Sequence, residues 1–290
     1  MDVKKLFLPF LVVTIVFLGC TKLDPKIDAP SYIEINDYNV AYTSTYNNGG
    51  PGTTHQKFTD VLVFANNQTL GFYPIPCKIP VLGEGPTNIM IKPVIKTNGV
   101  SSVRGDYPFM RFYTANPDLQ RGQTTKLTPV FDYYSSIVFR WTEDFEGNGI
   151  SIIGNAAYDT SFKRVSYEKY EGNYALELAL NNNINCTLKS SSSFLLPATG
   201  TDIFLELNYK ADQGFEVGVI GNSPGQAPEM RAVGGVNASA SWNKIYMYLT
   251  TAVSTPPLYQ TYSVYFFASK DNNLSNPKIY IDNIKLISKN

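Results

Sequence analysis

Residues 242–249 have the sequence Trp-Asn-Lys-Ile-Tyr-Met-Tyr-Leu, in which two sets of side chains alternate one residue at a time. In a β-strand, successive side chains point to opposite faces of the sheet. The more apolar of the two faces consists of Asn243, Ile245, Met247 and Leu249. The other face consists of Trp242, Lys244, Tyr246 and Tyr248. This segment therefore predicts a strand with one face in a core and an aromatic, charged face turned outward.

The same two-residue period recurs through the second half of the chain. The segments that show it are 173–178, 203–209, 215–220, 262–267 and 278–287. The chain also holds 20 Tyr and 17 Phe, residues that suit pleated, half-buried surfaces. After the first twenty residues the sequence has no long helical period. We therefore expect an all-β fold.

The first half also shows short strand-like segments, separated by turn residues. About seven of them within roughly a hundred residues predict an Ig-like β-sandwich over 31–135. One pair, 59–65 and 70–73, is expected to form a hairpin through the turn at Asn66 and Asn67. Pro74, Pro76 and Pro80 exclude a central strand in the segment that follows. A second sandwich, a jelly roll, is expected over 136–290.

Composition excludes several classes of function. The 24 basic and 24 acidic residues balance, so no positive field would attract nucleic acid. The single histidine, His55, argues against a histidine-based triad and the usual zinc sites, and we expect it in a solvated loop. Cys77 and Cys186 fall in different expected domains, so each is interpreted as a small buried hydrophobe.

The N-terminus has the layout of a secretory signal peptide over residues 1–19. Lys4 and Lys5 precede an apolar run of about a dozen residues, and Gly19 comes before Cys20. The run is shorter than the roughly 20 residues that span a bilayer. Residues 20–30 have no apolar periodicity and are interpreted as a tether.

Leu18-Gly19-Cys20 resembles the lipobox of bacterial lipoproteins, which implies lipidation of Cys20. An incidental cysteine in an ordinary secreted protein is the alternative. Four segments also resemble an uncharacterised family of surface lipoproteins from the Bacteroidota: 60–64, 71–76, 80–85 and 107–109. This resemblance implies a lipid anchor in the outer membrane, exposure at the cell surface and no assigned activity.

The two ends of the second half, 141–147 and 278–287, are similar to the ends of galactose-binding-like jelly rolls, a frame that many carbohydrate-binding modules share. First and last strands of such a roll are neighbours. The resemblance implies that Asp144, Glu146 and Asp282 share a structural calcium ion, which prefers six to eight oxygen ligands. Alternatively, these acids cap turns or face water. No other cofactor is expected.

The expected outward face gives the main functional hypothesis. Trp242, Tyr246 and Tyr248 would form a ligand or partner face, unless Trp242 folds into the rim of the core.

The sequence distinguishes no catalytic acid and base among its carboxylates, so we expect that the protein is not an enzyme. The acids considered are Glu171, Glu177, Glu206 and Glu216. Two buried acids in a cleft would instead favour a hydrolase. We predict a non-catalytic surface lipoprotein that acts as an accessory subunit of an outer-membrane β-barrel complex. The alternative is a glycan-binding lipoprotein that uses the C-terminal jelly roll.

Overall fold

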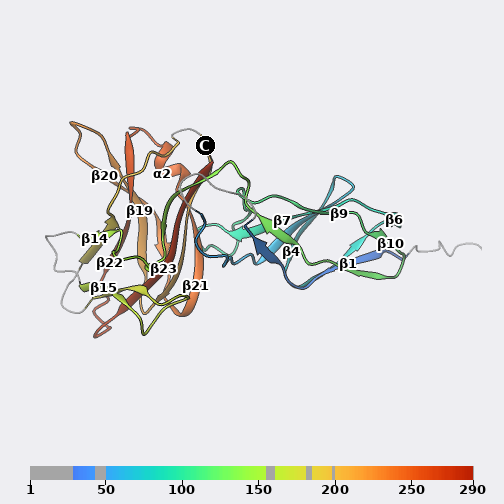
Figure 1. Cartoon of the computed structure of the whole chain (residues 1–290), viewed down its shortest axis with the longest axis horizontal. Coiled ribbons are helices and arrows are strands. Elements are labelled where there is room, and N and C mark those ends of the chain that lie inside the picture. The colour runs from blue at the N-terminus through green and yellow to red at the C-terminus, as the bar shows by residue number, and fades with distance from the viewer. Residues whose placement is uncertain (1–28, 43–49, 155–160, 181–184, 198–199, 290) are drawn as a thin grey trace, which may run out of the picture.

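The computed structural model shows two lobes arranged end to end (Figure 1), and it describes residues 29–42, 50–154, 161–180, 185–197 and 200–289. Nearly all regular structure is β, and α2 (Thr250–Ser254) is the one helix within these residues. The all-β prediction is confirmed. The signal peptide, most of the tether and Cys20 lie outside the described residues, so lipidation stays a prediction.

The C-terminal lobe is a sandwich of two antiparallel sheets. The first sheet has the order β15 (Ser161–Val165), β16 (Ala175–Ala179), β23 (Lys278–Lys289), β18 (Ile203–Ala211) and β21 (Ser239–Tyr248), and β13 (Ile137–Glu143) also pairs with β23. The second has the order β14 (Ile152–Gly154), β17 (Asn185–Ser190), β22 (Thr261–Ser269), β19 (Phe215–Asn222) and β20 (Glu229–Val236).

The connectivity of this lobe is that of a jelly roll. Every connection from β16 to β23 crosses between the two sheets except the one between β19 and β20. The first strand, β13, pairs with the last, β23, as expected from the sequence. Apolar side chains of both sheets, among them Leu207, Met247 and Val264, fill the space between them. Burial of this apolar surface holds the two sheets together.

The N-terminal lobe is built from shorter strands. Its largest sheet has the order β4 (Gln68–Pro74), β3 (Asp60–Ala65), β7 (Ile89–Lys96) and β8 (Arg104–Asp106), and β9 (Tyr113–Ala115) also pairs with β7. A second sheet has the order β11 (Thr124–Lys126), β1 (Ser31–Ile35) and β5 (Cys77–Val81). Two small pairs are β10 (Asp118–Leu119) with β6 (Gly85–Pro86) and β12 (Val130–Asp132) with β2 (Asn39–Ala41).

Two local predictions for this lobe are confirmed. β3 and β4 form the expected hairpin, and Asn66 and Asn67 take positive φ angles of 48° and 64° at its turn. Asparagine tolerates this left-handed conformation, which two-residue hairpin turns require. β5, which contains Pro80, lies at the edge of its sheet, where a missing backbone N–H costs no ladder hydrogen bond.

A shared apolar core joins the two lobes. Phe58, Tyr107 and Phe109 of the N-terminal lobe pack in one cluster with Phe204 and Tyr246 of the C-terminal lobe. The Phe109 and Phe204 rings meet edge to face, with centroids 5.7 Å apart. The N-terminal lobe therefore covers part of the outer face of the first sheet, so the two lobes are packed together.

Candidate binding pocket between the two lobes

The aromatic face expected on β21 is covered where Tyr246 lies. Tyr246 is 2% exposed, and its ring centroid is 5.4 Å from that of Tyr107. Its hydroxyl donates to Gln56 Oε1 at 2.8 Å and accepts from the Lys57 backbone N–H at 2.8 Å. The prediction that Tyr246 faces outward is therefore wrong. Alternation assigned the correct face to this side chain, but it could not show that another lobe packs on that face.

Tyr248 and Trp242 flank this covered region and are half-buried. The Tyr248 ring packs against Phe204 at 5.1 Å between centroids, and its backbone N–H donates to Asn98 Oδ1 at 2.7 Å. Trp242 Nε1 donates to Glu168 Oε1 at 2.7 Å, and the indole meets the Tyr170 ring edge to face. The three predicted aromatic residues thus contact parts of their own chain.

Charged side chains are enclosed where the lobes meet. Glu206 Oε2 and Lys244 Nζ are 2.8 Å apart, and both side chains have no exposed surface. The Tyr107 hydroxyl donates a hydrogen bond to Glu206 Oε1. Lys285 Nζ donates to the Thr53 carbonyl at 2.8 Å. Enclosed ions of this kind depend on their partners, since a buried charge left alone costs several kcal/mol.

The pKa values in this cluster follow from burial and from the excess of positive charge. Burial, and then repulsion by Lys244, lowers the pKa of Lys285 to about 7. Burial opposes ionisation of Glu206, but Lys244 and Lys285 outweigh it and hold the pKa of Glu206 below its usual value. The carboxylate thus stays charged and neutralises Lys244.

His55 belongs to the same junction. Its Nδ1 lies 3.1 Å from Asn208 Nδ2, and its ring is 4.4 Å from the Tyr170 ring. Burial, and then the charge of Lys244, lowers the pKa of His55 to about 4. The expectation of a solvated loop histidine is therefore wrong, because the C-terminal lobe packs against the segment that carries it.

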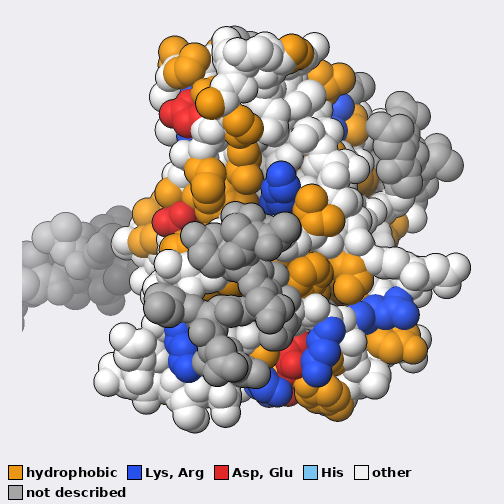
Figure 2. Space-filling model, turned by 90° about the vertical axis from the view of Figure 1, so that its left-hand side faces the viewer, with side chains coloured by type: hydrophobic (Ala, Val, Ile, Leu, Met, Phe, Trp, Pro, Cys, Tyr) orange, Lys and Arg blue, Asp and Glu red, His pale blue; other side chains and the backbone are white. Residues whose placement is uncertain are grey.

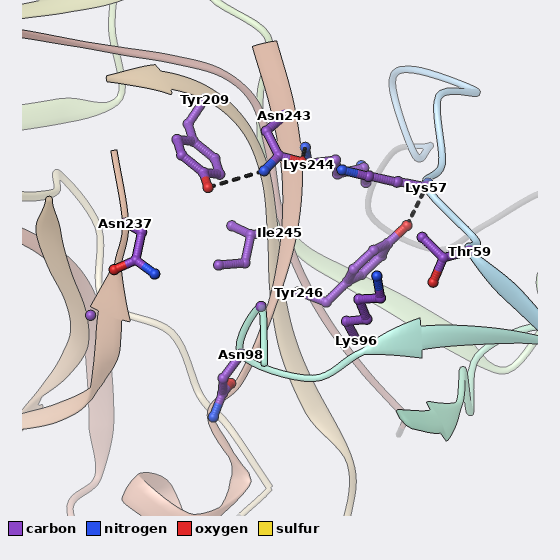
Figure 3. A pocket seen from close by; sticks show the side chains of 12 residues that line it. Lys57, Thr59, Lys96, Asn98, Tyr209, Asn237, Asn243, Lys244, Ile245 and Tyr246 are labelled. Carbon is purple, nitrogen blue, oxygen red and sulfur yellow. Dashed lines mark hydrogen bonds between the residues drawn. The ribbon is translucent and has the colours of Figure 1, made fainter. Parts of the chain in front are cut away.

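A cavity of about 120 Å³ lies beside this cluster, at the edge strand β21 (Figure 3). We call it the junction pocket. Both lobes contribute to its wall, and the residues that line it are Lys57, Thr59, Lys96, Asn98, Gly99, Tyr209, Gly235, Asn237, Asn243, Lys244, Ile245 and Tyr246. Its lining is dominated by amide, hydroxyl and ammonium groups.

Local structure fixes the position of these groups. Asn243 Nδ2 donates to the Tyr209 hydroxyl at 3.2 Å, and Asn243 Oδ1 accepts from Lys57 Nζ. The turn after β7 brings Asn98 to the edge of β21, where its backbone N–H donates to the Tyr246 carbonyl at 2.8 Å. Gly99 in this turn has φ +71°, and a Cβ there would come 3.0 Å from Ile245 Cδ1. Glycine therefore permits the close approach of the two lobes.

The residues predicted to hold calcium are bonded to backbone amides instead. Asp282 Oδ2 accepts from the Tyr170 and Glu171 N–H groups at 3.0 and 3.4 Å, and burial raises the pKa of Asp282 to about 7. Glu146 Oε1 accepts from the Asn173 N–H at 2.7 Å. Asp144 Oδ1 accepts from the N–H of Glu146 at 3.1 Å.

These contacts match the alternative of turn-capping acids. In the part of the chain that the structure describes, no group of three or more His, Cys, Asp or Glu side chains gathers as a metal site. The calcium ion therefore stays a prediction, and none of the described contacts supports it.

The opposite face of the sandwich, formed by the second sheet, is shown in Figure 2. Hydrophobic side chains and Lys or Arg side chains are both exposed on this side. On this sheet the Tyr265 hydroxyl donates to Glu216 Oε1 at 2.7 Å, and its ring lies over Gly218, where a Cβ would come 2.4 Å from it. Tyr265 therefore lies flat against its own sheet.

Several junction-pocket residues were not distinguished by the sequence. Lys57 and Asn98 lie outside the strands and Lys96 lies at the end of one, and none of the three belongs to a motif or follows a period. Only the packing of the lobes brings them together, so no local signal could have identified them. Lys244 is expected on the outward face with Tyr246, and this expectation is wrong, because its side chain is fully buried at the interface. Tyr209 is expected only as part of a strand.

No protein-family model and no curated protein matches the chain. Among solved structures, the chain is similar to the CBM22-1 xylan-binding domain of Paenibacillus barcinonensis Xyn10C, with 10% identity and a TM-score of 0.40 over 52% of this chain and 94% of that domain. It is also similar to the family 11 carbohydrate-binding module of Clostridium thermocellum, solved in complex with a β-1,3-1,4-mixed-linked tetrasaccharide. The values there are 17% identity and a TM-score of 0.37, over 50% of this chain and 92% of that module.

Within the described residues, no helix combines the length and apolar character needed to cross a membrane.

Proposed function

We propose that this protein is a non-catalytic carbohydrate-binding protein that holds its ligand in the junction pocket. The observation that carries the proposal is the polar lining of that cavity. Side-chain amides and hydroxyls both donate and accept hydrogen bonds, and ammonium groups donate them, which suits a ligand covered with hydroxyl groups. Asn98, Asn237 and Asn243 supply amides, and Tyr209 and Tyr246 supply rings and hydroxyls.

The lining favours binding over cleavage. Glycoside hydrolysis needs a pair of carboxyl groups that flank the scissile bond, and the described residues that line the junction pocket include no Asp or Glu. Glu206 lies near the pocket wall, but Lys244 and Tyr107 occupy its carboxylate at the closed interface. A carboxylate held in this way is not available to protonate a glycosidic oxygen.

The main prediction from the sequence, an accessory subunit that docks a membrane protein, now has less support than its glycan-binding alternative. It relied on an open aromatic face at Trp242, Tyr246 and Tyr248, and the N-terminal lobe covers that face at Tyr246. Attachment to the outer membrane through a lipidated Cys20 remains part of the proposal. It is supported by Lys4, Lys5 and the apolar run before Gly19. A lipid anchor would hold the two lobes beside the membrane, where they could reach extracellular saccharides.

A glycan microarray probed with the full chain in mild detergent tests the function. We expect retention of a defined set of saccharides, and at least about a tenfold loss of affinity in the Asn237→Ala variant. Asn237 is an exposed pocket residue, so its replacement leaves the core intact. The matched control is Asn36→Ala, an exposed asparagine that bonds Glu34 in the N-terminal lobe. A blank array, or equal losses in both variants, would remove carbohydrate binding at this pocket.

A further inference from the structure

We propose that the saccharide bound in the junction pocket is acidic and that Lys57 and Lys96 bind its carboxylate. This inference rests on the proposed function and specifies the class of ligand. Lys57 comes from the segment before β3, and Lys96 is the last residue of β7, so two separate segments bring their ammonium groups to one cavity (Figure 3). Both segments belong to the N-terminal lobe.

The two ammonium groups have no carboxylate partner among the described residues. Lys57 Nζ donates to the neutral Asn243 Oδ1, and the described residues place no carboxylate in an ion pair with Lys96. Neighbouring basic residues differ in this respect. Lys92 pairs with Asp106, and Arg104 pairs with Asp60 at 3.1 Å. The nearby acids are therefore already paired with other cations, and the positive charge at the pocket is left for a ligand.

The electrostatics of the pocket agree with this geometry. Burial, and then repulsion by Lys96, lowers the pKa of Lys57. Two like charges facing one cavity destabilise each other unless an anion lies between them. A bound carboxylate between Lys57 and Lys96 would replace this repulsion with two attractive, charge-assisted contacts.

Lys244 also lines the cavity, but its ammonium group has no surface that a ligand could contact. Lys244 Nζ is fully buried and pairs with Glu206 Oε2 at 2.8 Å. Its charge is therefore already neutralised, and the unpaired positive charge at the pocket belongs to Lys57 and Lys96.

The size and lining of the pocket favour an acidic sugar over a free inorganic oxyanion. A cavity of about 120 Å³ exceeds the roughly 10–15 Å³ needed for one water several-fold, and three asparagines share its wall. A uronate residue offers a carboxylate to Lys57 and Lys96 and ring hydroxyls to Asn237 and Asn243. Sulfate accepts hydrogen bonds but has no hydroxyl group to donate to the amide oxygens in the wall.

Calorimetric titration of the full chain with matched sugars tests this inference. The probes are trimers of galacturonate, glucuronate and mannuronate, the corresponding neutral trimers of galactose, glucose and mannose, and inorganic sulfate and phosphate. We expect one uronate trimer to bind at least about tenfold more tightly than its neutral counterpart, and added salt to reduce the difference. Lys57→Met combined with Lys96→Met should abolish the preference. Lys126→Met, which removes an exposed lysine of β11, should leave it unchanged.

The outcomes distinguish failure of the acidic ligand alone from failure of carbohydrate binding. Equal affinity for acidic and neutral sugars, unchanged in the double lysine variant, would overturn the acidic ligand and leave carbohydrate binding in place. Binding of sulfate or phosphate without any sugar would overturn both the saccharide function and the uronate, and it would leave a free-oxyanion site. No binding of any probe by a protein that melts as a folded unit would overturn both.

Discussion

The outer face of the first sheet carries ion pairs in two different environments. At one part, the N-terminal lobe encloses Glu206 and Lys244, and neither side chain reaches solvent. At another part, Glu177 pairs with Lys278 at 3.0 Å and with Lys163 at 3.6 Å, and both lysines are partly exposed. Both ions of the first pair are therefore enclosed, whereas the lysines that pair with Glu177 are in contact with solvent. Enclosed charges respond to any lost partner, whereas solvated charges are screened.

The largest expected effect comes from Glu206→Gln. This change removes the carboxylate that neutralises Lys244 and leaves buried positive charge without a counter-ion. We expect a loss of about 3–5 kcal/mol in the free energy of unfolding, measured by urea denaturation. Glu177→Gln is the matched variant, since its lysine partners can turn to solvent, and its loss should be less than half as large. Equal losses would remove the distinction between the two regions.

The second effect is a pH dependence that comes from Lys285. Its pKa is about 7 in the folded chain and 10.5 in the reference state, so between these values the unfolded chain binds the extra proton. The free energy of unfolding therefore rises by on the order of 3 kcal/mol between about pH 7 and about pH 10. Below pH 7 the folded state holds a charged ammonium group in the interface, which destabilises it.

The measurement for Lys285 is urea denaturation over this pH range for the wild type and for Lys285→Met. Methionine has a similar length without the charge, so the variant should lose the alkaline rise. Subtracting the two profiles removes the contributions of other titrating groups. Parallel profiles for the two proteins would contradict the lowered pKa.

Tyr246→Phe gives a smaller effect. The hydroxyl of Tyr246 donates to the buried Gln56 Oε1 and accepts from the part-buried Lys57 N–H, so its removal takes one hydrogen bond from each of these groups. The expected loss is about 1–3 kcal/mol. Tyr248→Phe is the matched control, because its side chain is half-buried and contacts Phe204 through the ring. Thermal unfolding of the two variants should separate them, and a larger shift for Tyr248→Phe would argue against the enclosed network.

The smallest effect is expected from Glu168→Gln. Glu168 accepts hydrogen bonds from Trp242 Nε1 and from Lys210, and it remains partly exposed. A partly solvated ion pair contributes about 0.2–1 kcal/mol, so denaturation midpoints should hardly change. A loss comparable with that of Glu206→Gln would show that the loop around Glu168 seals its ions as tightly as the N-terminal lobe does.

The fold could be predicted from local patterns because those patterns are physical causes of the strands. Alternation placed Ile245 and Met247 in the core, and the turn at Asn66 and Asn67 set the first hairpin. The pairing of the first and last strands also followed from the sequence resemblance. In each case the residues that carry the signal lie close in sequence, or belong to a frame that many sequences share.

The site could not be predicted in the same way. Tyr246 was assigned to the correct face, but the packing of the other lobe decides whether that face meets solvent. Lys57 and Lys96 carry no motif, and each meets β21 only through contacts more than a hundred residues apart in sequence. The resemblance groups Asp282 with Asp144 and Glu146 around a calcium ion, yet the Asp282 oxygens accept hydrogen bonds from backbone amides. Long-range packing sets the properties of all these groups.

We expect a saccharide to bind in the pocket enclosed by both lobes rather than on the outer face of the second sheet. The decisive experiment is a crystal structure of the full chain with the tightest-binding uronate trimer. It should show a sugar in the junction pocket, with its carboxylate between Lys57 and Lys96 and its hydroxyls on Asn237 and Asn243. A sugar seated instead on the face shown in Figure 2, with the junction pocket holding only water, would contradict it.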